Sequence, residues 1–111
     1  MKLYHNPRCQ KSREALALLE DKAEKPELVL YMTEPLLPNE LEELIEKLDI
    51  NPIELVRTKE KVWKEEFADK ELTDYEVVLA MIEYPQLMER PILEKGEKAV
   101  VGRPPEKVLE L

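Results

Sequence analysis

Cys9, the only cysteine of the chain, lies in a segment whose residue types suit thiol chemistry: His5-Asn6-Pro7-Arg8-Cys9-Gln10-Lys11-Ser12-Arg13. A thiol reacts as its thiolate, and a free pKa of about 8.5 leaves only a few per cent ionised at neutral pH. Cys9 precedes a predicted helix, whose first N–H groups favour an anion, and Arg8, Lys11 and Arg13 add positive charge. The Ser12 hydroxyl could donate a hydrogen bond to the sulfur. We therefore expect an activated thiolate rather than an inert thiol in a core position.

The charge of the chain is concentrated around this thiol. Residues 1–13 hold four basic residues and no acid, whereas the whole chain of 111 residues carries a net charge of −8. The only histidine, His5, belongs to the same segment, either as a strand-end residue with a local hydrogen bond or as a modulator of Cys9. An acidic chain is not suited to wrapping nucleic acid, so we expect a small-anion site and no nucleic-acid partner.

Three arginines outside this segment stand at predicted breaks in secondary structure. Arg57 ends a helical turn, Arg90 precedes Pro91 and Arg103 precedes Pro104. The planar guanidinium offers a fork of donors that suits tetrahedral oxyanions. Taken singly, each could equally be a surface arginine paired with one of the many glutamates; taken together, they are candidate oxyanion ligands.

The residue inventory excludes several classes of protein. A single cysteine cannot form an intramolecular disulfide, and one cysteine with one histidine falls short of a tetrahedral zinc site unless carboxylates or a second chain complete it. Two glycines cannot build a Gly-rich phosphate loop. No apolar run approaches the roughly 18 residues of a membrane span. We expect a cytoplasmic monomer with no metal, no bound cofactor and no membrane contact.

The elements that must position Cys9 follow a β-α-β order. Residues 2–5 form a short strand candidate, and residues 10 to about 23 follow the helical period. The apolar run at residues 28–31 predicts a strand buried on both faces, as in a parallel pair. Cys9 therefore lies in the connection between the first strand and the helix.

The rest of the chain predicts a helical insert and a second pair of strands. The insert covers about residues 39–84. Its first helix, over 40–48, is capped by Asn39 and is followed by a helical turn through Leu55. A short helix around Trp63 and Phe67 comes next, and a last helix over 74–84 begins with a capping box at Thr73. Beyond it, residues 92–93 and 99–101 predict a hairpin, and Pro104-Pro105 begins a C-terminal helix. This order predicts one α/β domain, residues 1–111, with a small mixed sheet of thioredoxin-like order.

With these residues assembled, the sequence resembles the arsenate reductase family of the ArsC type, the glutaredoxin-dependent branch with a thioredoxin-like fold. The N-terminal signature His-x3-Cys-x3-Arg stands here as His5, Cys9 and Arg13. The C-terminal signature stands as Glu89-Arg90-Pro91-Ile92 and Gly102-Arg103-Pro104-Pro105. The segment Pro-Arg-Cys-Gln-Lys-Ser differs from the Pro-Ala-Cys-Gly-Thr-Ser of the best-known arsenate reductases and is similar to a Pro-Arg-Cys-x-Lys-Ser subgroup.

The resemblance implies a role for each matching position. Cys9 is the implied nucleophile toward arsenate, and the implied oxyanion ligands are Arg57, Arg90 and Arg103. His5, Ser12 and Arg13 are implied to tune the thiolate, Asn6 to order the loop, and the Arg90–Pro91 bond to be cis. Glutathione is the implied co-substrate that attacks the Cys9 adduct, and glutaredoxin is the implied partner that reduces the mixed disulfide.

Three other functions share parts of this pattern. A phosphatase-like arsenate reductase needs Cys-x5-Arg, and Ala15 occupies that arginine position here. A monothiol glutathione-dependent thiol-disulfide oxidoreductase would use the same fold and nucleophile but would not require the three arginines to converge. A transcriptional regulator of the Spx type shares the fold, yet such regulators often carry Cys-x-x-Cys, where this chain has Ser12.

Overall fold

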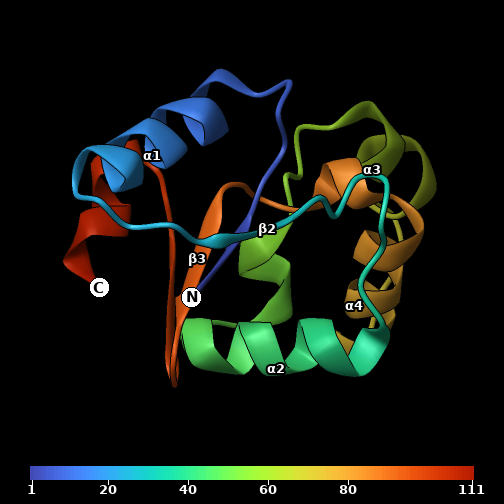
Figure 1. Ribbon diagram of the computed structural model, residues 1–111. Coiled ribbons are helices and arrows are strands. Elements are labelled where there is room, and N and C mark those ends of the chain that lie inside the picture. Colours follow the sequence, from blue (N-terminus) through green and yellow to red (C-terminus); the bar gives the residue numbers. More distant parts are fainter. The chain divides into compact units, whose positions relative to one another are not determined.

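The computed structural model describes residues 1–111, and these divide into two units, Met1–Glu34 with Arg90–Leu111, and Pro35–Glu89. We call them the sheet unit and the helical unit. The helical insert expected over about residues 39–84 lies within the helical unit. The elements of the sheet unit are β1 (Lys2–Tyr4), α1 (Gln10–Asp21), β2 (Glu27–Val29), β3 (Ile92–Lys95), β4 (Lys98–Val101) and the 3-10 helix η3 (Pro105–Glu110) (Figure 1).

The four strands form one mixed sheet in the order β2-β1-β3-β4. Leu3 of the central strand β1 pairs with Leu28 of β2 in parallel and with Leu93 of β3 in antiparallel register. β3 and β4 form the predicted hairpin, and Gly96 at its turn has a φ of +63°, a conformation that glycine adopts without steric cost. The predicted small mixed sheet is therefore confirmed.

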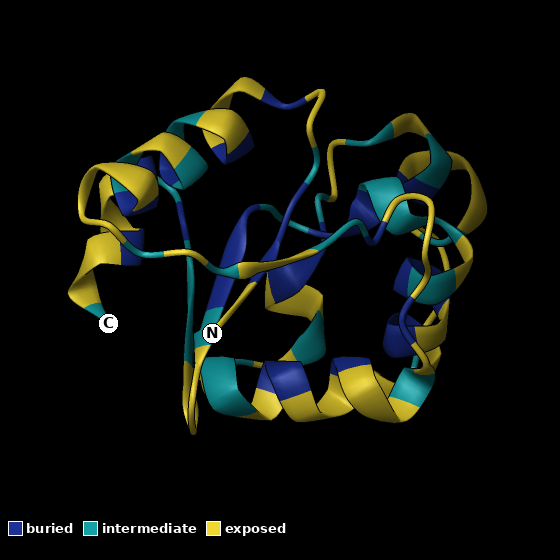
Figure 2. Ribbon diagram, in the orientation of Figure 1, coloured by how far each residue is buried: buried dark blue, intermediate teal, exposed yellow.

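The sheet unit is held together by an apolar cluster that joins the sheet to α1 and η3. Its buried members are Leu3, Ala15, Leu19, Leu93 and Val108. Figure 2 colours the ribbon by burial, with buried residues in dark blue. Ala15 and Leu19 lie one turn apart on α1, so they face the sheet together. Fully burying a leucine contributes about 1.5–3 kcal/mol. This packing anchors α1, and with it the loop that carries Cys9.

One prediction for the sheet unit was wrong. The strand expected to be buried on both faces, β2, is an edge strand, and Leu28 is 43% exposed. β2 pairs only with β1 and ends at Val29, so of the apolar run at residues 28–31 only Tyr31, beyond the strand, is fully buried. The C-terminal helix starts at Pro104-Pro105 as predicted, with Pro104 as N-cap, and is a 3-10 helix.

The helical unit contains the predicted succession of helices: α2 (Pro38–Leu48), the 3-10 helix η1 (Pro52–Leu55), α3 (Lys61–Glu66), α4 (Asp74–Glu83) and the 3-10 helix η2 (Pro85–Leu87). The capping box at Thr73 is confirmed, because Glu76 N–H donates to Thr73 Oγ1 and Thr73 N–H donates to Glu76 Oε1. Asn39 does not cap α2, since the helix already starts at Pro38. Proline is favoured at a first helical position because its missing N–H would have no partner there.

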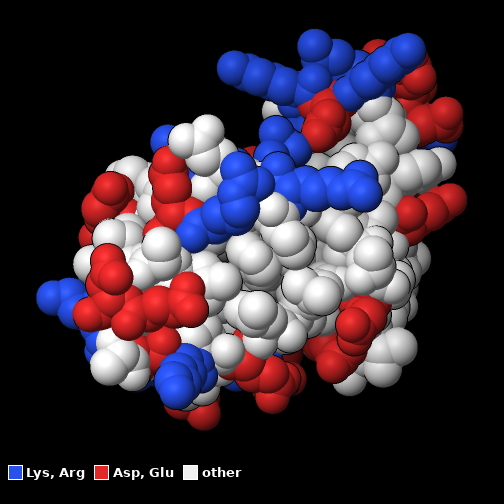
Figure 3. Space-filling view, turned by 45° about the horizontal axis from the view of Figure 1, so that its top comes forward, with Lys and Arg blue, Asp and Glu red and all other residues white.

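The two units differ sharply in charge. The helical unit holds 15 acidic and 6 basic residues, a net charge of −9, whereas the sheet unit holds 10 and 11, a net charge of +1. Charged side chains of both signs project from the surface in Figure 3. The acidity of the chain is therefore a property of the helical unit alone. No helix has the length and apolar character needed to cross a membrane.

Candidate active site

Cys9 is the N-cap residue of α1 and connects the loop after β1 to that helix. Its N–H donates to the carbonyl oxygen of Asn6 at 2.9 Å, and its own carbonyl oxygen accepts from the N–H of Arg13 at 3.0 Å. The side chain is only 9% exposed, so the expectation that a cysteine among charged neighbours would avoid a buried position was wrong. Sequence neighbours do not determine burial here, because Arg8, Gln10 and Lys11 project outward while Cys9 does not.

Side chains of the same segment order the loop that precedes Cys9. Asn6 Oδ1 accepts a hydrogen bond from the N–H of Arg8 at 3.1 Å. Arg13 Nη1 donates to the carbonyl oxygen of Pro7 at 2.9 Å. These bonds fix the backbone at Pro7 and Arg8, directly before Cys9, to Asn6 and to Arg13 of α1.

His5 and Ser12 form a buried pair beneath the loop. His5 Nδ1 and Ser12 Oγ are 2.6 Å apart, and Ser12 Oγ also accepts from the N–H of Asn6 at 3.1 Å. His5 is 4% exposed and Ser12 is fully buried. Burial, followed by the positive charge of Arg13, lowers the pKa of His5, which favours the neutral imidazole.

The pKa of Cys9 is lowered by a balance of opposing effects. Burial raises the pKa, but it is outweighed by the backbone N–H of Ser12, the positive charge of the nearby Arg90 side chain and the backbone N–H of Lys11. The direction agrees with the predicted activation at a helix N-terminus. Two expected contributors to the lowered pKa differ from the prediction. The Ser12 hydroxyl bonds to His5 instead of the sulfur, and the positive charge that lowers the pKa is that of Arg90 rather than that of Arg8, Lys11 or Arg13.

The basic residues next to Cys9 in sequence are engaged elsewhere. The Lys11 side chain pairs with Glu14 at 3.8 Å, and Arg13 bonds to Pro7. A helix turns successive side chains away from one another, so charge that is close in sequence need not be close to the thiol.

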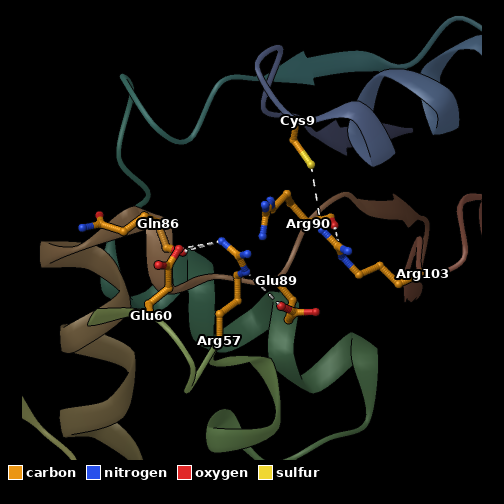
Figure 4. Close-up of polar contacts among 7 residues, drawn as sticks. All are labelled: Cys9, Arg57, Glu60, Gln86, Glu89, Arg90 and Arg103. Carbon is orange, nitrogen blue, oxygen red and sulfur yellow. Dashed lines mark hydrogen bonds and ion pairs between the residues drawn. The ribbon is translucent and has the colours of Figure 1, made fainter. Parts of the chain in front are cut away.

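Arg90 and Arg103 both lie at Cys9 (Figure 4). Arg103 Nη2 is 3.8 Å from Cys9 Sγ, and Arg103 Nε donates to the carbonyl oxygen of Arg90 at 2.9 Å. Arg90 Nε and Nη1 are buried and donate to no acceptor in the protein. Because an unpaired buried donor costs about 1–3 kcal/mol, and more when charged, these two N–H groups are suited to receive an anion.

Each of these two arginines precedes a cis proline. The Arg90–Pro91 bond is cis, as the family resemblance implied, and the Arg103–Pro104 bond is cis as well. Gly102, next to Arg103, was not assigned a role from sequence. A Cβ at this position would lie 2.9 Å from Pro91 Cγ and 3.0 Å from Val108 Cγ1. Only glycine allows the segment after β4, which carries Arg103, to pass so close to Pro91.

Arg57 belongs to the helical unit and is held there by two carboxylates (Figure 4). Arg57 Nη1 donates to Glu60 Oε1 at 2.7 Å, and Arg57 Nε lies 3.4 Å from Glu89 Oε1. The backbone N–H groups of Arg57 and Glu89 bond to Leu87 and Leu55 on either side of a bridge between Val56 and Met88. The structure thus brings Arg90 and Arg103 to Cys9 within the sheet unit and describes Arg57 with its own acidic partners.

Comparisons with known proteins agree with this geometry. A model described as the ArsC family matches residues 4–111. The chain is 47% identical over 113 residues to the uncharacterized protein YfgD of Escherichia coli strain K12, covering 100% of this chain and 95% of that one. It is 44% identical to an arsenate reductase of Haemophilus influenzae, covering 98% and 96%. A solved structure of an arsenate reductase from Vibrio cholerae superposes with a TM-score of 0.93 at 42% identity, covering 99% and 97%. These likenesses confirm the predicted thioredoxin-like α/β fold.

Proposed function

Because this chain belongs to the ArsC family, we propose that it is an oxidoreductase that reduces arsenate to arsenite through a covalent adduct on Cys9. The observation that carries the proposal is the pair of buried, unpartnered donors on Arg90, Nε and Nη1, on a guanidinium whose charge lowers the pKa of Cys9. The same group can therefore bind an oxyanion and stabilise the thiolate that attacks it.

In the first step the Cys9 thiolate attacks the arsenic of dihydrogen arsenate and forms a sulfur–arsenic(V) bond. One oxygen of arsenate leaves as water, with both protons of the anion. Arg90 and Arg103 neutralise the negative charge of the oxyanion, which would otherwise repel a thiolate. The N-terminal N–H groups of α1 add to this stabilisation. Arg57 is proposed as a third oxyanion ligand on the strength of its match to the family pattern.

In the second step a glutathione thiolate attacks the Cys9 sulfur. The sulfur–arsenic bond breaks and leaves its electron pair on arsenic, so arsenic(V) becomes arsenic(III) and arsenite is released. Cys9 remains as a mixed disulfide with glutathione, which glutaredoxin then reduces. An external thiol is needed because the chain has no second cysteine to resolve the intermediate.

The alternative of a monothiol thiol-disulfide oxidoreductase is less well supported. A disulfide substrate carries no charge at its reacting sulfurs and would leave the buried N–H groups of Arg90 without acceptors. An oxyanion substrate satisfies them. The unpaired donors therefore favour arsenate, or an oxyanion of the same shape, over a disulfide.

The test is arsenate-dependent turnover by the purified protein with glutathione, glutaredoxin, glutathione reductase and NADPH, compared with Cys9→Ser and Arg90→Gln. We expect Cys9→Ser to abolish turnover and Arg90→Gln to reduce kcat/KM for arsenate by at least tenfold. Lys98→Gln, which removes an exposed positive charge from β4, is the matched control and should retain turnover. Turnover of hydroxyethyl disulfide without arsenate turnover would overturn the proposal.

A further inference from the structure

The helical unit contains a groove between α2, η1 and α4, which we call the α2–α4 groove. Its volume is about 340 Å³, and its floor is apolar, with Ile45, Ile50 and Val78 among the lining side chains. That volume is at the small end of the roughly 300–1,000 Å³ of ligand pockets. None of the residues proposed for catalysis lines it.

Every charged side chain that lines the groove is acidic. Glu42 and Glu46 lie one turn apart on α2, and Asp74 lies in the first turn of α4. All three are exposed, and no lysine or arginine lines the groove. Since the helical unit has a net charge of −9, these rim charges are not neutralised by the unit as a whole. Such a field attracts a positively charged partner and disfavours an acidic one.

An exposed aromatic side chain adds an anchor point to the same groove. Tyr75 lines it, is 50% exposed and donates no hydrogen bond to the protein. Tyrosine is enriched in protein interfaces because its ring offers rigid apolar area and its face attracts a lysine or arginine cation. The groove therefore offers apolar side chains, an acidic rim and an exposed aromatic ring. These features are complementary to a segment that carries basic and apolar side chains on one face.

We propose that the α2–α4 groove binds a basic amphipathic segment of a partner protein. Apolar side chains of that segment contact the accessible lining residues Ile50, Pro52 and Tyr75, above the buried Ile45 and Val78. Its lysine or arginine side chains pair with Glu42, Glu46 and Asp74. This inference does not depend on the proposed reductase activity, because binding uses the helical unit and no residue of the sheet unit.

The probe is a fluorescein-labelled 14-residue peptide of leucine and lysine with leucines at helical spacing, titrated by fluorescence anisotropy into the full chain. Neutralising the rim in one variant, Glu42→Gln with Glu46→Gln and Asp74→Asn, should weaken binding at least tenfold. The matched control, Glu66→Gln with Asp69→Asn and Glu71→Gln, removes three exposed charges of the same unit outside the groove and should change affinity less than twofold.

A second pair of variants tests the apolar contact on α4. Tyr75→Ala should weaken binding at least threefold, whereas Leu79→Ala, an exposed apolar residue of the same helix that does not line the groove, should leave it unchanged. Cys9→Ser should bind the peptide as the unaltered chain does, which separates this result from any failure of the reductase proposal.

Three outcomes would overturn the inference. Equal loss of binding in the rim and control triple variants would mean that the peptide responds only to the net negative charge of the chain and not to the groove. Amide shifts in nuclear magnetic resonance that avoid α2 and α4 would place binding elsewhere. Shifts of the groove residues with protein concentration alone would identify a second copy of the chain as the occupant. If the rim triple variant fails to fold, the Tyr75 and Leu79 pair gives the decision.

Discussion

Arg103 is bonded to the backbone of Arg90: its Nε donates to the Arg90 carbonyl oxygen at 2.9 Å (Figure 4). The same guanidinium places Nη2 at 3.8 Å from Cys9 Sγ. One planar group therefore links the segment that presents Arg90 to the sulfur. A guanidinium held at one edge cannot rotate freely, so its remaining donors keep a constant direction toward the thiol.

The first prediction concerns the thiolate. The rate of Cys9 alkylation by iodoacetamide should titrate below the pKa of an ordinary thiol, because the pKa of Cys9 is lowered. Arg90→Gln removes a positive charge that favours the thiolate, so the pKa should rise and alkylation at pH 7 should slow several-fold. Lys98→Gln is the control. An unchanged alkylation profile in Arg90→Gln would contradict the assignment of Arg90.

The second prediction separates the two polar groups of Ser12. Ser12→Ala removes the hydroxyl that bonds to His5 and Asn6 but keeps the backbone N–H that lowers the pKa of Cys9. The loss of a buried acceptor should reduce the free energy of unfolding by about 1–3 kcal/mol, measured by urea denaturation. The pH profile of alkylation should stay close to that of the unaltered protein. A profile shifted to that of a free thiol would show that the hydroxyl acts on the sulfur directly.

The third prediction concerns the stability of the fold at mildly acidic pH. The pKa of buried His5 is lowered, so in the unfolded chain His5 binds a proton near pH 6.5 and in the folded chain only at lower pH. Its contribution to stability is therefore complete above about pH 6.5 and declines as the pH falls below that value. Urea midpoints at pH 7 and 5.5 should differ more for the unaltered protein than for His5→Asn. Equal differences would refute a titrating His5.

The fourth prediction compares the two glycines. Gly102→Ala forces a Cβ against Pro91 and Val108, which should cost about 1–3 kcal/mol and displace Arg103 from Cys9. Arsenate turnover should fall with it. Gly96→Ala meets no atom within 4 Å but has a φ of +63°, so it should cost about 1–2 kcal/mol and leave turnover intact. Urea denaturation and the arsenate assay measure both effects, and equal activity in the two variants would contradict the role of Gly102.

Local features of this protein could be predicted because their causes are local. The capping box at Thr73 needs only residues within one helical turn, and the position of Cys9 at the start of α1 follows from the end of one periodic pattern and the start of another. The strand and helix order followed from the same reasoning. The motifs at His5–Arg13 and Glu89–Pro105 pointed to the family whose model matches residues 4–111.

What the sequence alone determined is therefore the element order and the residue types of the candidate nucleophile and the candidate oxyanion ligands. Only the tertiary structure decided which cations lie at the thiol: Arg90 and Arg103, distant in sequence, rather than its neighbours Arg8 and Lys11. It also directed the Ser12 hydroxyl to His5 and left β2 at the sheet edge. The physical reason is that burial and charge act through space, whereas helix and strand patterns act along the chain, so only folding brings Arg90 and Arg103 to Cys9.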